Sequence, residues 1–376
     1  MTRMKVLHVY RTYFPDPPGG LQEAIRQICI STQPYGVENT VFTLSPNPAP
    51  KSLDRPEAKV VRCRSWIAPA SCDLGGLDAV QTFRALAQQA DVIHYLFPWP
   101  YADVLRLLAP KKPSVLTYVS DIVRQRWMGA AYGPLMWHTL RRMDAIVCNA
   151  PRYAAGSAVL THPELQPLVR HIPLGIDESA YATPADTAVL DRLGLQASEP
   201  FVLFIGVLRY YKGLHVLLDA CANVKGRVVI AGTGPEEQAL KDQVARLGLN
   251  NVLLAGRVTE GEKIALLQAC RGLVLPSHLR SEAYGMVLVE ASIMSRPMVT
   301  CEIGTGTSFV NSDGETGWVV PPKSPTALAV ALNRLLTDAE LAQRYGRAAR
   351  QRYEALFSGD ALGRAYARLF EGVLNP

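Results

Sequence analysis

Residues 272–294 of the chain, GLVLPSHLRSEAYGMVLVEASIM, hold a strand, a loop and a helix in direct succession. Gly272–Pro276 is a short run of leucine and valine that favours a buried β-strand. Val287–Met294 predicts a helix, and Ser281–Gly285 is then the loop that connects the two. A buried apolar strand that leads straight into a helix is typical of a parallel sheet with helices on both faces. The stretch therefore predicts an α/β fold.

The same alternation continues along the whole chain, and it runs through twice. In the first half we expect strands at Lys5–Tyr10, Thr40–Leu44, Ala90–Leu96, Ser114–Tyr118, Asp144–Cys148 and Val169–Ile172. In the second half we expect them at Phe201–Gly206, Arg227–Ala231, Asn251–Ala255, Gly272–Leu275 and Pro297–Cys301. Helix-length segments separate most of these runs, and Pro173–Pro200 marks the break. The pattern predicts two doubly wound, Rossmann-like parallel-sheet domains facing a cleft, where ligands bind beyond the carboxyl ends of the strands.

The composition agrees with two domains that each bury a core, because the chain has 376 residues and 48% of them are hydrophobic. No apolar run reaches the roughly 18 residues that span a bilayer. The N-terminus, MTRMKVLHVY, leads into a strand without a secretory signal. The seven cysteines are scattered and form no CxxC pair, which indicates free thiols in a reducing compartment. We therefore expect a cytoplasmic protein.

The net charge of +6 is unevenly distributed. Residues 1–178 carry 19 Lys and Arg against 14 Asp and Glu, whereas the remainder carries 20 against 19. A basic first half suggests anionic partners such as phosphate groups or a membrane surface. No nucleic-acid motif is present, so we expect no nucleic-acid partner.

Two carboxylates, Glu282 and Glu290, lie eight positions apart around the predicted loop and helix start. The N-terminus of a helix offers unpaired N–H groups that suit a phosphate or diphosphate, and Gly285 lets such a ligand approach the backbone closely. Glu282 would lie in the loop and Glu290 one to two turns into the helix, so each would meet a different part of a long ligand. A solvated loop carboxylate and a helix-surface carboxylate are the alternative interpretation.

Residues 206–214, GVLRYYKGL, follow another predicted strand. Arg209 and Lys212 would lie at its carboxyl end, where cations serve a diphosphate, although loop cations are usually only solvated. Glycine-rich turns at AGTGPEE (231–237) and EIGTGTSF (302–309) lack the full spacing of a phosphate loop, and tight turns explain them almost as well. At YFPDPPGG (13–20), the two glycines would either open a helix from about Leu21 at the cleft or form a flexible turn.

Residues 124–142, RQRWMGAAYGPLMWHTLRR, combine arginines with tryptophans. Such a helix can lie on an anionic membrane, and a packed helix with a charged outer face is equally consistent with the pattern. The chain has no D-x-D motif and its histidines have no metal-ligand spacing, so we expect no metal site.

In combination and order, these motifs resemble glycosyltransferase family 4, which has the two-domain GT-B fold. The resemblance rests on the E-x7-E of Glu282 and Glu290, the loop with Arg209 and Lys212, the GTGP turn, PLGID near the linker and the early glycine pair. The strings HYLFPWP, SDIVRQR, LRYYKGL, LRSEAYG and EIGTGTSFV are similar to a narrower branch. That branch contains bacterial mannosyl- and rhamnosyltransferases that use GDP-sugars to build lipopolysaccharide O-chains and related polysaccharides.

The resemblance implies an acceptor-binding domain at 1–177, a donor-binding domain at 178–358, and a C-terminal helix at 359–374 that packs back on the first domain. It implies catalytic roles for Glu282 at the transferred sugar and for Arg209 and Lys212 at the diphosphate. Glu290 would bind the ribose. It places the rest of the nucleotide-sugar site at Gly19, Gly20, Gly232, Gly234, Val258, Ser281, Tyr284, Gly285, Met286 and Val287. No cofactor other than the nucleotide-sugar donor is implied, and the family retains the anomeric configuration.

Three positions depart from the family pattern. Val119, in TYVSD, stands where members commonly have histidine, and Leu96 stands where the narrower branch often has a second one. Val207 occupies the position of a common arginine, so Arg209 lies two residues later than expected.

The function we expect is transfer of a mannose- or rhamnose-type hexose from a GDP-sugar to a lipid-linked glycan, on the inner face of the plasma membrane. Two alternatives stay open. One is a catalytically weak glycan- or nucleotide-binding subunit of a glycosyltransferase complex, which the missing histidines favour. The other is a sugar-nucleotide epimerase on the same fold, which would require additional acid or base residues.

Overall fold

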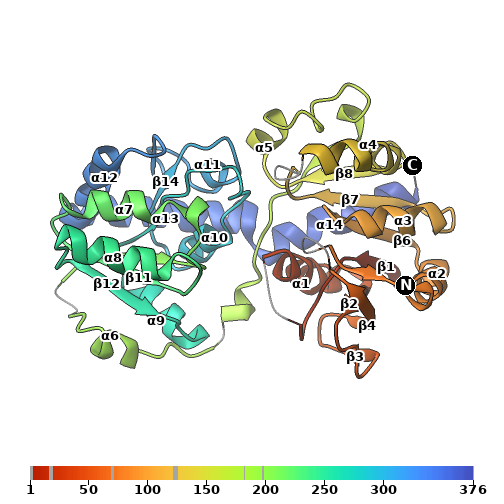
Figure 1. Cartoon of the computed structure of the whole chain (residues 1–376), viewed down its shortest axis with the longest axis horizontal. Coiled ribbons are helices and arrows are strands. Elements are labelled where there is room, and N and C mark those ends of the chain that lie inside the picture. Colours follow the sequence, from red (N-terminus) through yellow and green to blue (C-terminus); the bar gives the residue numbers. More distant parts are fainter. Residues whose placement is uncertain are drawn as a thin grey trace. The chain divides into compact units, whose positions relative to one another are not determined.

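The computed structural model describes residues 3–16, 20–68, 72–121, 126–181, 183–196 and 199–375, with the backbone alone at 126–131 and 180. The chain divides into two compact units (Figure 1). The first unit comprises Met1–Asp177 and Gly359–Pro376, and the second comprises Glu178–Ser358.

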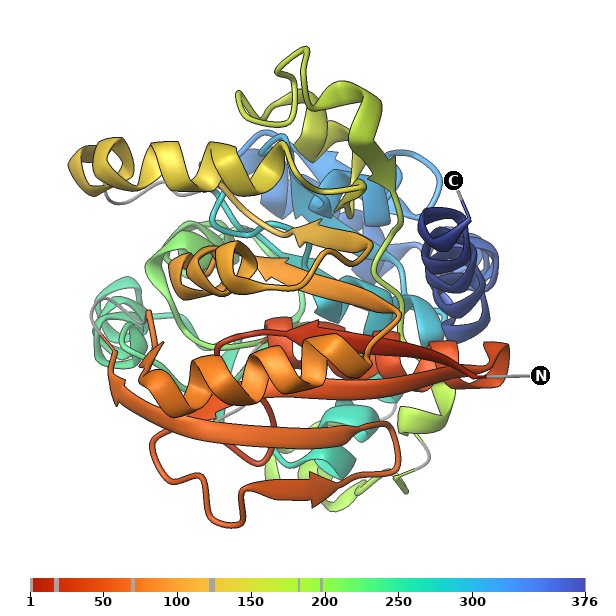
Figure 2. The same cartoon turned by 90° about the vertical axis from the view of Figure 1, so that its right-hand side faces the viewer.

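The first unit is built on a sheet with the strand order β3-β4-β2-β1-β6-β7-β8-β9, and β5 pairs with β4 (Figure 2). Its strands are β1 (Met4–Val9), β2 (Val37–Ser45), β3 (Ser52–Asp54), β4 (Lys59–Ile67), β5 (Leu74–Gly75), β6 (Val92–Phe97), β7 (Ser114–Tyr118), β8 (Ala145–Cys148) and β9 (Val169–His171). All pairings are parallel except those of β3 and β5 with β4. The carboxyl ends of the central strands therefore share one edge of the sheet.

Helices cover this sheet, as its apolar strands require. They are α1 (Gly20–Thr32), α2 (Leu77–Gln89), α3 (Pro100–Leu108), α4 (Arg126–Leu140), α5 (Pro151–Ala155) and α14 (Gly359–Leu374). The last helix returns from the end of the chain and buries Leu362, Tyr366 and Phe370 against Val6 and Val115. No helix in the described part of the chain is long and apolar enough to cross a membrane.

A chain of buried polar side chains crosses the centre of this sheet. Asn39 Oδ1 lies 2.9 Å from His8 Nε2, the Nδ1 atoms of His8 and His94 are 2.9 Å apart, and His94 Nε2 lies 2.7 Å from Thr117 Oγ1. Tyr366 from α14 completes it at 2.9 Å from Thr117. Burial lowers the pKa of His8 to about 4, against the opposing effect of the Asn39 hydrogen bond, and burial beside His8 lowers that of His94. Both rings are therefore neutral at pH 7.

In this row of buried polar side chains, the hydrogen bonds at its start determine which atom donates and which accepts in each later one. Asn39 donates its amide to Cys29 O, so its oxygen accepts from His8 Nε2–H. His8 Nδ1 must then accept from His94 Nδ1–H, and His94 Nε2 accepts from the Thr117 hydroxyl. Each donor has one acceptor, which is what burial of so many polar groups requires.

The second unit has a six-stranded sheet with the order β12-β11-β10-β13-β14-β15, and every pair is parallel. Its strands are β10 (Phe201–Ile205), β11 (Arg227–Ala231), β12 (Val252–Gly256), β13 (Gly272–Leu275), β14 (Met298–Cys301) and β15 (Gly317–Val320). Its helices are α6 (Ala188–Arg192), α7 (Leu214–Cys221), α8 (Glu237–Leu247), α9 (Glu260–Ala269), α10 (Met286–Ile293), α11 (Thr307–Val310), α12 (Pro325–Thr337) and α13 (Ala339–Arg352).

The predicted α/β class with two parallel sheets is confirmed, and all eleven predicted strands are present within a few residues. The sequence patterns missed β3, β4, β5 and β15. All seven cysteines are free, and all but Cys72 are buried. Leu96 does not present a side chain at an open site: it packs in the apolar core with Tyr10, Tyr13 and Ile25.

Candidate active site

The most prominent polar contact at the strand ends of the second unit joins Lys212 and Glu282. Lys212 ends a single 3-10 turn (Tyr210–Lys212) that follows β10, and Glu282 lies in the loop that follows β13. Because β10 and β13 are parallel neighbours, these two loops emerge side by side. Lys212 Nζ lies 2.6 Å from Glu282 Oε2, and Ser277 donates to the same oxygen at 3.2 Å. The two charged side chains are only 12% and 10% exposed.

The loop then turns into α10 through Gly285, whose φ of 81° is a left-handed conformation that favours glycine. Tyr284 just before it is buried, and Ser281 is exposed. The helix begins at Met286, and among the described residues no acceptor lies within hydrogen-bonding distance of the Met286 and Val287 amides. Unpaired amides at a helix start attract an anion. The pair of Lys212 and Glu282 therefore lies in the loop that leads to a potential phosphate site.

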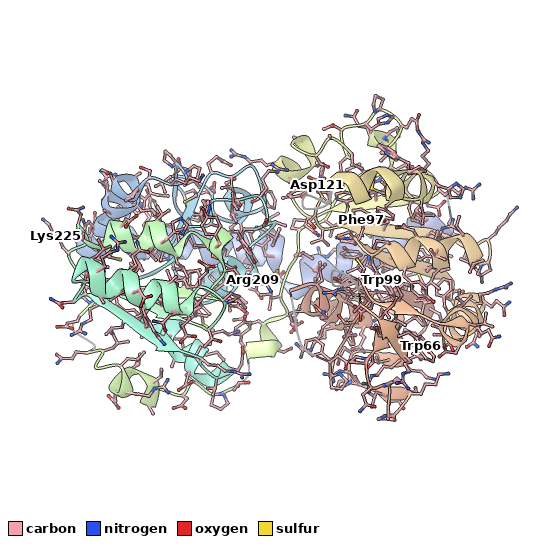
Figure 3. All side chains as sticks on the ribbon, viewed as in Figure 1. Trp66, Phe97, Trp99, Asp121, Arg209 and Lys225 are labelled. Atoms are coloured by element: carbon pink, nitrogen blue, oxygen red, sulfur yellow. The ribbon has the colours of Figure 1, made fainter. Side chains whose placement is uncertain are left out.

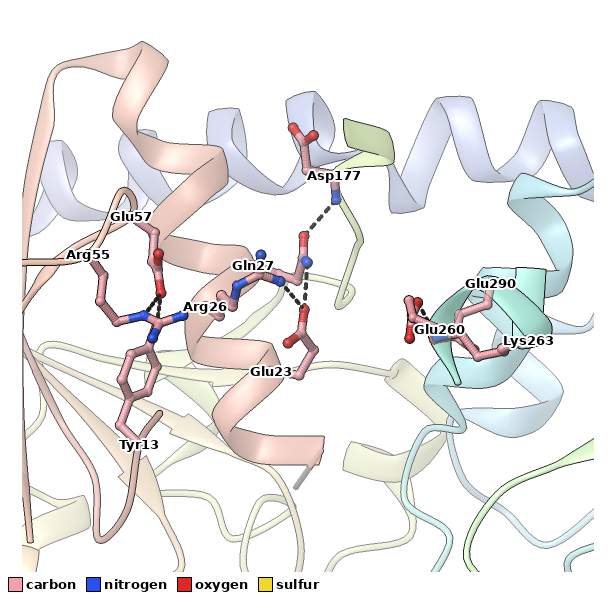
Figure 4. A network of polar contacts seen from close by, with 10 residues as sticks. All are labelled: Tyr13, Glu23, Arg26, Gln27, Arg55, Glu57, Asp177, Glu260, Lys263 and Glu290. Carbon is pink, nitrogen blue, oxygen red and sulfur yellow. Dashed lines mark hydrogen bonds and ion pairs between the residues drawn. The ribbon is translucent and has the colours of Figure 1, made fainter. Parts of the chain in front are cut away.

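Glu290 lies one turn further along α10 and contacts a residue that sequence reasoning missed. Lys263 of α9 lies 3.1 Å from Glu290 Oε1 and 2.7 Å from Glu260 Oε1 (Figure 4). Its ammonium group also lies over the ring of Tyr181. Burial lowers the pKa of Lys263, but the two carboxylates outweigh burial and raise the pKa above its ordinary value. Lys263 is 27 residues from Glu290 in sequence. The fold brings the two together by placing α9 beside α10.

Val258 is half-buried just before α9, whose start is fixed by a capping box between Thr259 and Glu262. The nucleotide position that the resemblance implied for Val258 therefore lies on a rigid turn beside Glu260.

The glycines of the GTGP turn have a packing role. A Cβ on Gly232 would lie 2.0 Å from Gly206 O, and one on Gly234 would lie 2.4 Å from Leu208 O. Leu208 also donates its amide to Thr233 O at 3.0 Å. The turn thus supports the loop that carries Arg209 and Lys212, and this close backbone approach accounts for both glycines.

Other predicted residues do not join this cluster. Arg209 is exposed, and its guanidinium has no hydrogen-bond or ion-pair partner among the described residues (Figure 3). Gly20 begins α1 in the first unit, and a Cβ there would meet nothing within 4 Å, so sterics do not require glycine. Gly19 lies outside the described residues, as does Arg124 of the basic aromatic segment.

His278 is a further residue that the motif analysis did not single out. It is 6% exposed, and its ring makes edge contacts with Tyr210 and His215 at centroid distances of 5.0 and 5.1 Å. Its amide donates to Tyr211 O at 3.0 Å, which ties the loop after β13 to the loop after β10. Burial, then the nearby His215 and Lys323, lower the pKa of His278. A neutral imidazole thus packs beneath the Lys212 loop.

At the strand ends of the first unit, the loop after β7 is anchored rather than open. Asp121 accepts hydrogen bonds from Tyr118 at 2.9 Å, Tyr153 at 3.1 Å and Ser157 at 2.6 Å. Val119 is half-buried, and its amide donates to Phe97 O at 3.2 Å. Among the described residues, no group of three or more His, Cys, Asp or Glu is placed to hold a metal ion.

Comparison with known proteins identifies the family. A family model described as glycosyl transferases group 1 matches residues 188–352, and one described as a glycosyl transferase 4-like domain matches residues 19–163. The D-rhamnosyltransferase WbpZ of Pseudomonas aeruginosa is 44% identical over 356 residues, 94% of this chain and 92% of the relative. The O-antigen chain mannosyltransferase C of Escherichia coli is 38% identical over 373 residues, 99% of each chain.

A solved structure shows the same fold. Sucrose-phosphate synthase from Thermosynechococcus elongatus superimposes with a TM-score of 0.79 over 99% of both chains, at 21% sequence identity. With the full-length relatives, this likeness establishes that the chain is a retaining glycosyltransferase of family 4 with the GT-B fold.

Proposed function

We propose that this enzyme transfers a mannose- or rhamnose-type hexose from a GDP-sugar to a lipid-linked glycan during O-chain synthesis. Two relatives that match nearly the whole chain, a D-rhamnosyltransferase and an O-antigen chain mannosyltransferase, support this choice of sugar and product. The observation that carries the mechanism is the Lys212–Glu282 pair in the loops that precede the unpaired amides of α10. The acceptor would place the enzyme on the inner face of the plasma membrane.

In this proposal the second unit binds the donor. The diphosphate lies against the Met286 and Val287 amides with Lys212 beside it, and Glu282 contacts the transferred sugar. As the glycosidic bond breaks, negative charge develops on the leaving diphosphate. A cation and amide dipoles that are already oriented stabilise this charge without reorganisation. The Glu282 carboxylate, which also accepts from the Ser277 hydroxyl, holds the ammonium group of Lys212 in place for that role.

Retention of configuration fits attack from the face that the diphosphate leaves. The acceptor hydroxyl then attacks the anomeric carbon while the leaving phosphate oxygen takes its proton. No protein nucleophile is required by this scheme. Arg209, which is exposed, would close on the diphosphate only when the donor is bound.

The nucleoside would lie over the start of α10 and α9. Glu290 would accept from a ribose hydroxyl, and the contact with Lys263 orients that carboxylate. Glu260 is half-exposed beside Val258. A carboxylate there can accept from the N1–H and exocyclic amine of guanine, whereas uracil offers a single N–H. This chemistry supports GDP as the carrier.

The test is a product assay with radiolabelled GDP-mannose and GDP-rhamnose, each with a lipid-linked acceptor, in EDTA and in added magnesium. We expect a labelled lipid-linked product with one of the two donors, formed equally well in EDTA. Turnover that is lost in EDTA and restored by magnesium would contradict the cation-only mechanism. A label that stays on the nucleotide as an altered sugar would identify an epimerase, and no turnover despite GDP binding would identify a binding subunit.

A further inference from the structure

His278 of the second unit is buried without the hydrogen bonds that its ring can make. The side chain is 6% exposed, and its Nδ1 and Nε2 atoms are buried and have no partner among the described residues. A neutral imidazole carries one N–H donor and one acceptor nitrogen, so a donor and an acceptor are both left unpaired. Burial of unpaired polar groups destabilises a folded protein.

Other buried histidines of the chain are fully paired. His8 and His94 in the first unit are buried, and each of their ring nitrogens has a partner within 2.9 Å. At position 278 a phenylalanine would fill a similar space without unpaired nitrogens. Packing alone therefore does not account for a histidine at this position.

The ring of His278 lies under the turn that carries Lys212 and contacts residues on both sides of this lysine. Tyr210 packs against the ring edge to face, and a Cβ on Gly213 would lie 3.3 Å from Nδ1. The His278 amide also donates to Tyr211 O. A shift of this turn therefore moves Lys212 and changes the surroundings of the imidazole at the same time.

Partners for both ring nitrogens are present in this segment. Gly213 is the N-cap of α7 and makes no side-chain cap, and the Leu214 and His215 amides that follow have no acceptor among the described residues. One of these amides can donate to the acceptor nitrogen of the imidazole, as it would to a capping side chain. A carbonyl oxygen of the turn can accept from the imidazole N–H. Because Nδ1 already lies beside Gly213, a small displacement of the turn brings these groups within reach.

We propose that His278 is a positioning residue for Lys212, and that its imidazole gains its hydrogen bonds when the turn closes on the diphosphate of the bound donor. The inference rests on the proposed function, because it takes the donor diphosphate as the ligand of Lys212. In the free enzyme the unpaired nitrogens destabilise the open turn. In the donor complex they are paired, and this difference favours closure and holds the ammonium group at the leaving diphosphate.

The surroundings of His278 separate this role from direct chemistry. The rings of Tyr210 and His215 stack at a centroid distance of 5.0 Å, and both pack against His278. Its two nitrogens are covered, so no reacting atom contacts them in this arrangement. A metal-binding role has no support either, because no group of three or more His, Cys, Asp or Glu in the described part of the chain is placed to hold an ion.

The experiment compares His278→Phe with His278→Asn in the full-length enzyme. Phenylalanine keeps a ring and removes both nitrogens, so this variant should melt at the wild-type temperature or above it. We expect kcat/KM for the donor to fall by about tenfold, since a hydrogen bond formed on closure is lost, while the KM of the acceptor stays unchanged. Asparagine places an oxygen or an amide near the position of Nδ1 and should recover part of the loss.

His94→Phe is the matched control, because that ring is also buried but has both nitrogens paired. It should melt at a lower temperature than the wild type and keep the wild-type kcat/KM. Wild-type kinetics in His278→Phe would overturn the proposal. Equal losses in His278→Phe and His278→Asn would also overturn it, because a hydrogen-bonding group would then make no difference.

Nuclear magnetic resonance of isotope-labelled histidine follows the ring in the wild-type enzyme. The nitrogen signals of His278, assigned by their absence from the His278→Asn spectrum, should shift when GDP is added. GDP binding without such a shift would overturn the proposal. If calorimetry shows that the wild type binds UDP and not GDP, the proposed carrier is wrong, and the shift is measured with UDP instead. Failure of the role of His278 is therefore distinguishable from failure of the proposed function.

Discussion

The two units are built alike as helix-covered parallel sheets, but two of their polar clusters, one in each unit, differ in place and in kind. In the first unit the polar groups lie in the middle of the sheet, where the chain from Asn39 through His8, His94 and Thr117 to Tyr366 pairs every donor with an acceptor. In the second unit the pair that we assign to the site lies in the loops beyond the strand ends. There the Lys212–Glu282 pair is nearly buried, and the first amides of α10 lack an acceptor among the described residues.

The difference separates a structural network from a site that awaits a ligand. A neutral network with all its hydrogen bonds made inside the protein has nothing left to offer a substrate, and it holds α14 on the sheet. A buried ion pair without its full set of partners costs free energy in the unliganded protein, because desolvation is incompletely offset. In the Lys212–Glu282 pair, contacts with the bound substrate would offset this free-energy cost.

The largest expected effect comes from removing Lys212. We expect Lys212→Met to lower kcat by about a hundred- to a thousandfold, since one preorganised charge at the leaving group is lost. Glu282→Gln should lower kcat as well, and the double variant should be little worse than the worse single variant, because the two residues act as a unit. Steady-state kinetics with the radiolabelled donor measures all three.

The matched control is Lys225→Met, which removes an exposed lysine just before β11 (Figure 3). This lysine lies at the amino ends of the strands, whereas Lys212 lies at their carboxyl ends. It should leave kcat unchanged. Fully additive losses in Lys212→Met and Glu282→Gln would show that the ion pair does not operate as a unit, and the contrast between the two units would lose its main support.

The second prediction concerns the stability of the first unit at low pH. His8 has a pKa of about 4 in the folded protein, below its ordinary 6.5, so the unfolded chain binds more protons between these values. The stabilisation is therefore complete above pH 6.5 and declines as pH falls to 4, by about 3 kcal/mol for this one group. The lowered pKa of His94 acts in the same direction. Urea unfolding at pH 7 and pH 4.5 measures the effect.

The variant His8→Gln/His94→Gln separates the contribution of these two rings to the pH dependence of stability from that of other groups. One opposing group is Asp103, whose pKa is raised by burial to about 6 and whose protonation stabilises the folded state as pH falls. We expect the double variant to be less stable at pH 7 but much less sensitive to pH than the wild type. His171→Gln, at an exposed position of β9, serves as the control. An unchanged pH dependence in the double variant would refute the buried neutral pair.

Sequence patterns predicted all the strands in the centre of each sheet and also the edge strands β9 and β12, because these are mostly apolar runs. They missed β4, whose Lys59, Arg62 and Arg64 interrupt the apolar pattern near the edge of the sheet. They also missed β15, a four-residue edge strand in which Gly317 begins the run. The missed strands are short or interrupted by charged residues, so they lack the apolar run by which a strand is predicted.

The sequence predicted the positions of site residues in loops that follow strands, but not those of residues whose contacts depend on the packing of helices. Lys212, Glu282 and the start of α10 were predictable, since parallel topology places the carboxyl ends of neighbouring strands together. Lys263 and His278 were not, because their contacts with Glu290 and Tyr210 depend on how α9 and two loops pack. The roles of Gly232 and Gly234 also emerged only from the distances to the neighbouring loop.

A third, intermediate effect is expected at Glu290. We expect Glu290→Ala to weaken GDP binding by roughly 1.5–3 kcal/mol, because a ribose hydroxyl loses a charged acceptor. Glu290→Gln should lose less, as the amide oxygen still accepts a hydrogen bond. Calorimetry measures both affinities. If GDP binds Glu290→Ala as tightly as the wild type, Glu290 serves only to neutralise Lys263, and the ribose lies elsewhere.

The smallest effect is expected at Val119, which lies at the strand ends of the first unit rather than in its core. Val119 is half-buried at the end of β7, and its backbone is held by Phe97 O on one side and by the anchored Asp121 loop on the other. If family members with histidine here bond the donor sugar or leaving phosphate, valine forgoes one hydrogen bond, worth about 1 kcal/mol. We therefore expect Val119→His to raise the transfer rate several-fold, unless the pocket has repacked around valine.

In that second case the imidazole would strain a filled site, and the variant would unfold at lower temperature without any gain in rate. Val119→Leu distinguishes the two cases, because it adds volume without a hydrogen-bonding group. Faster transfer by the histidine variant alone would assign the position to the chemistry, whereas equal destabilisation by both variants would assign it to packing. Unchanged kinetics and unchanged melting temperature in both would show that Val119 is remote from the substrate, and that the histidine of the family corresponds to another residue of this chain.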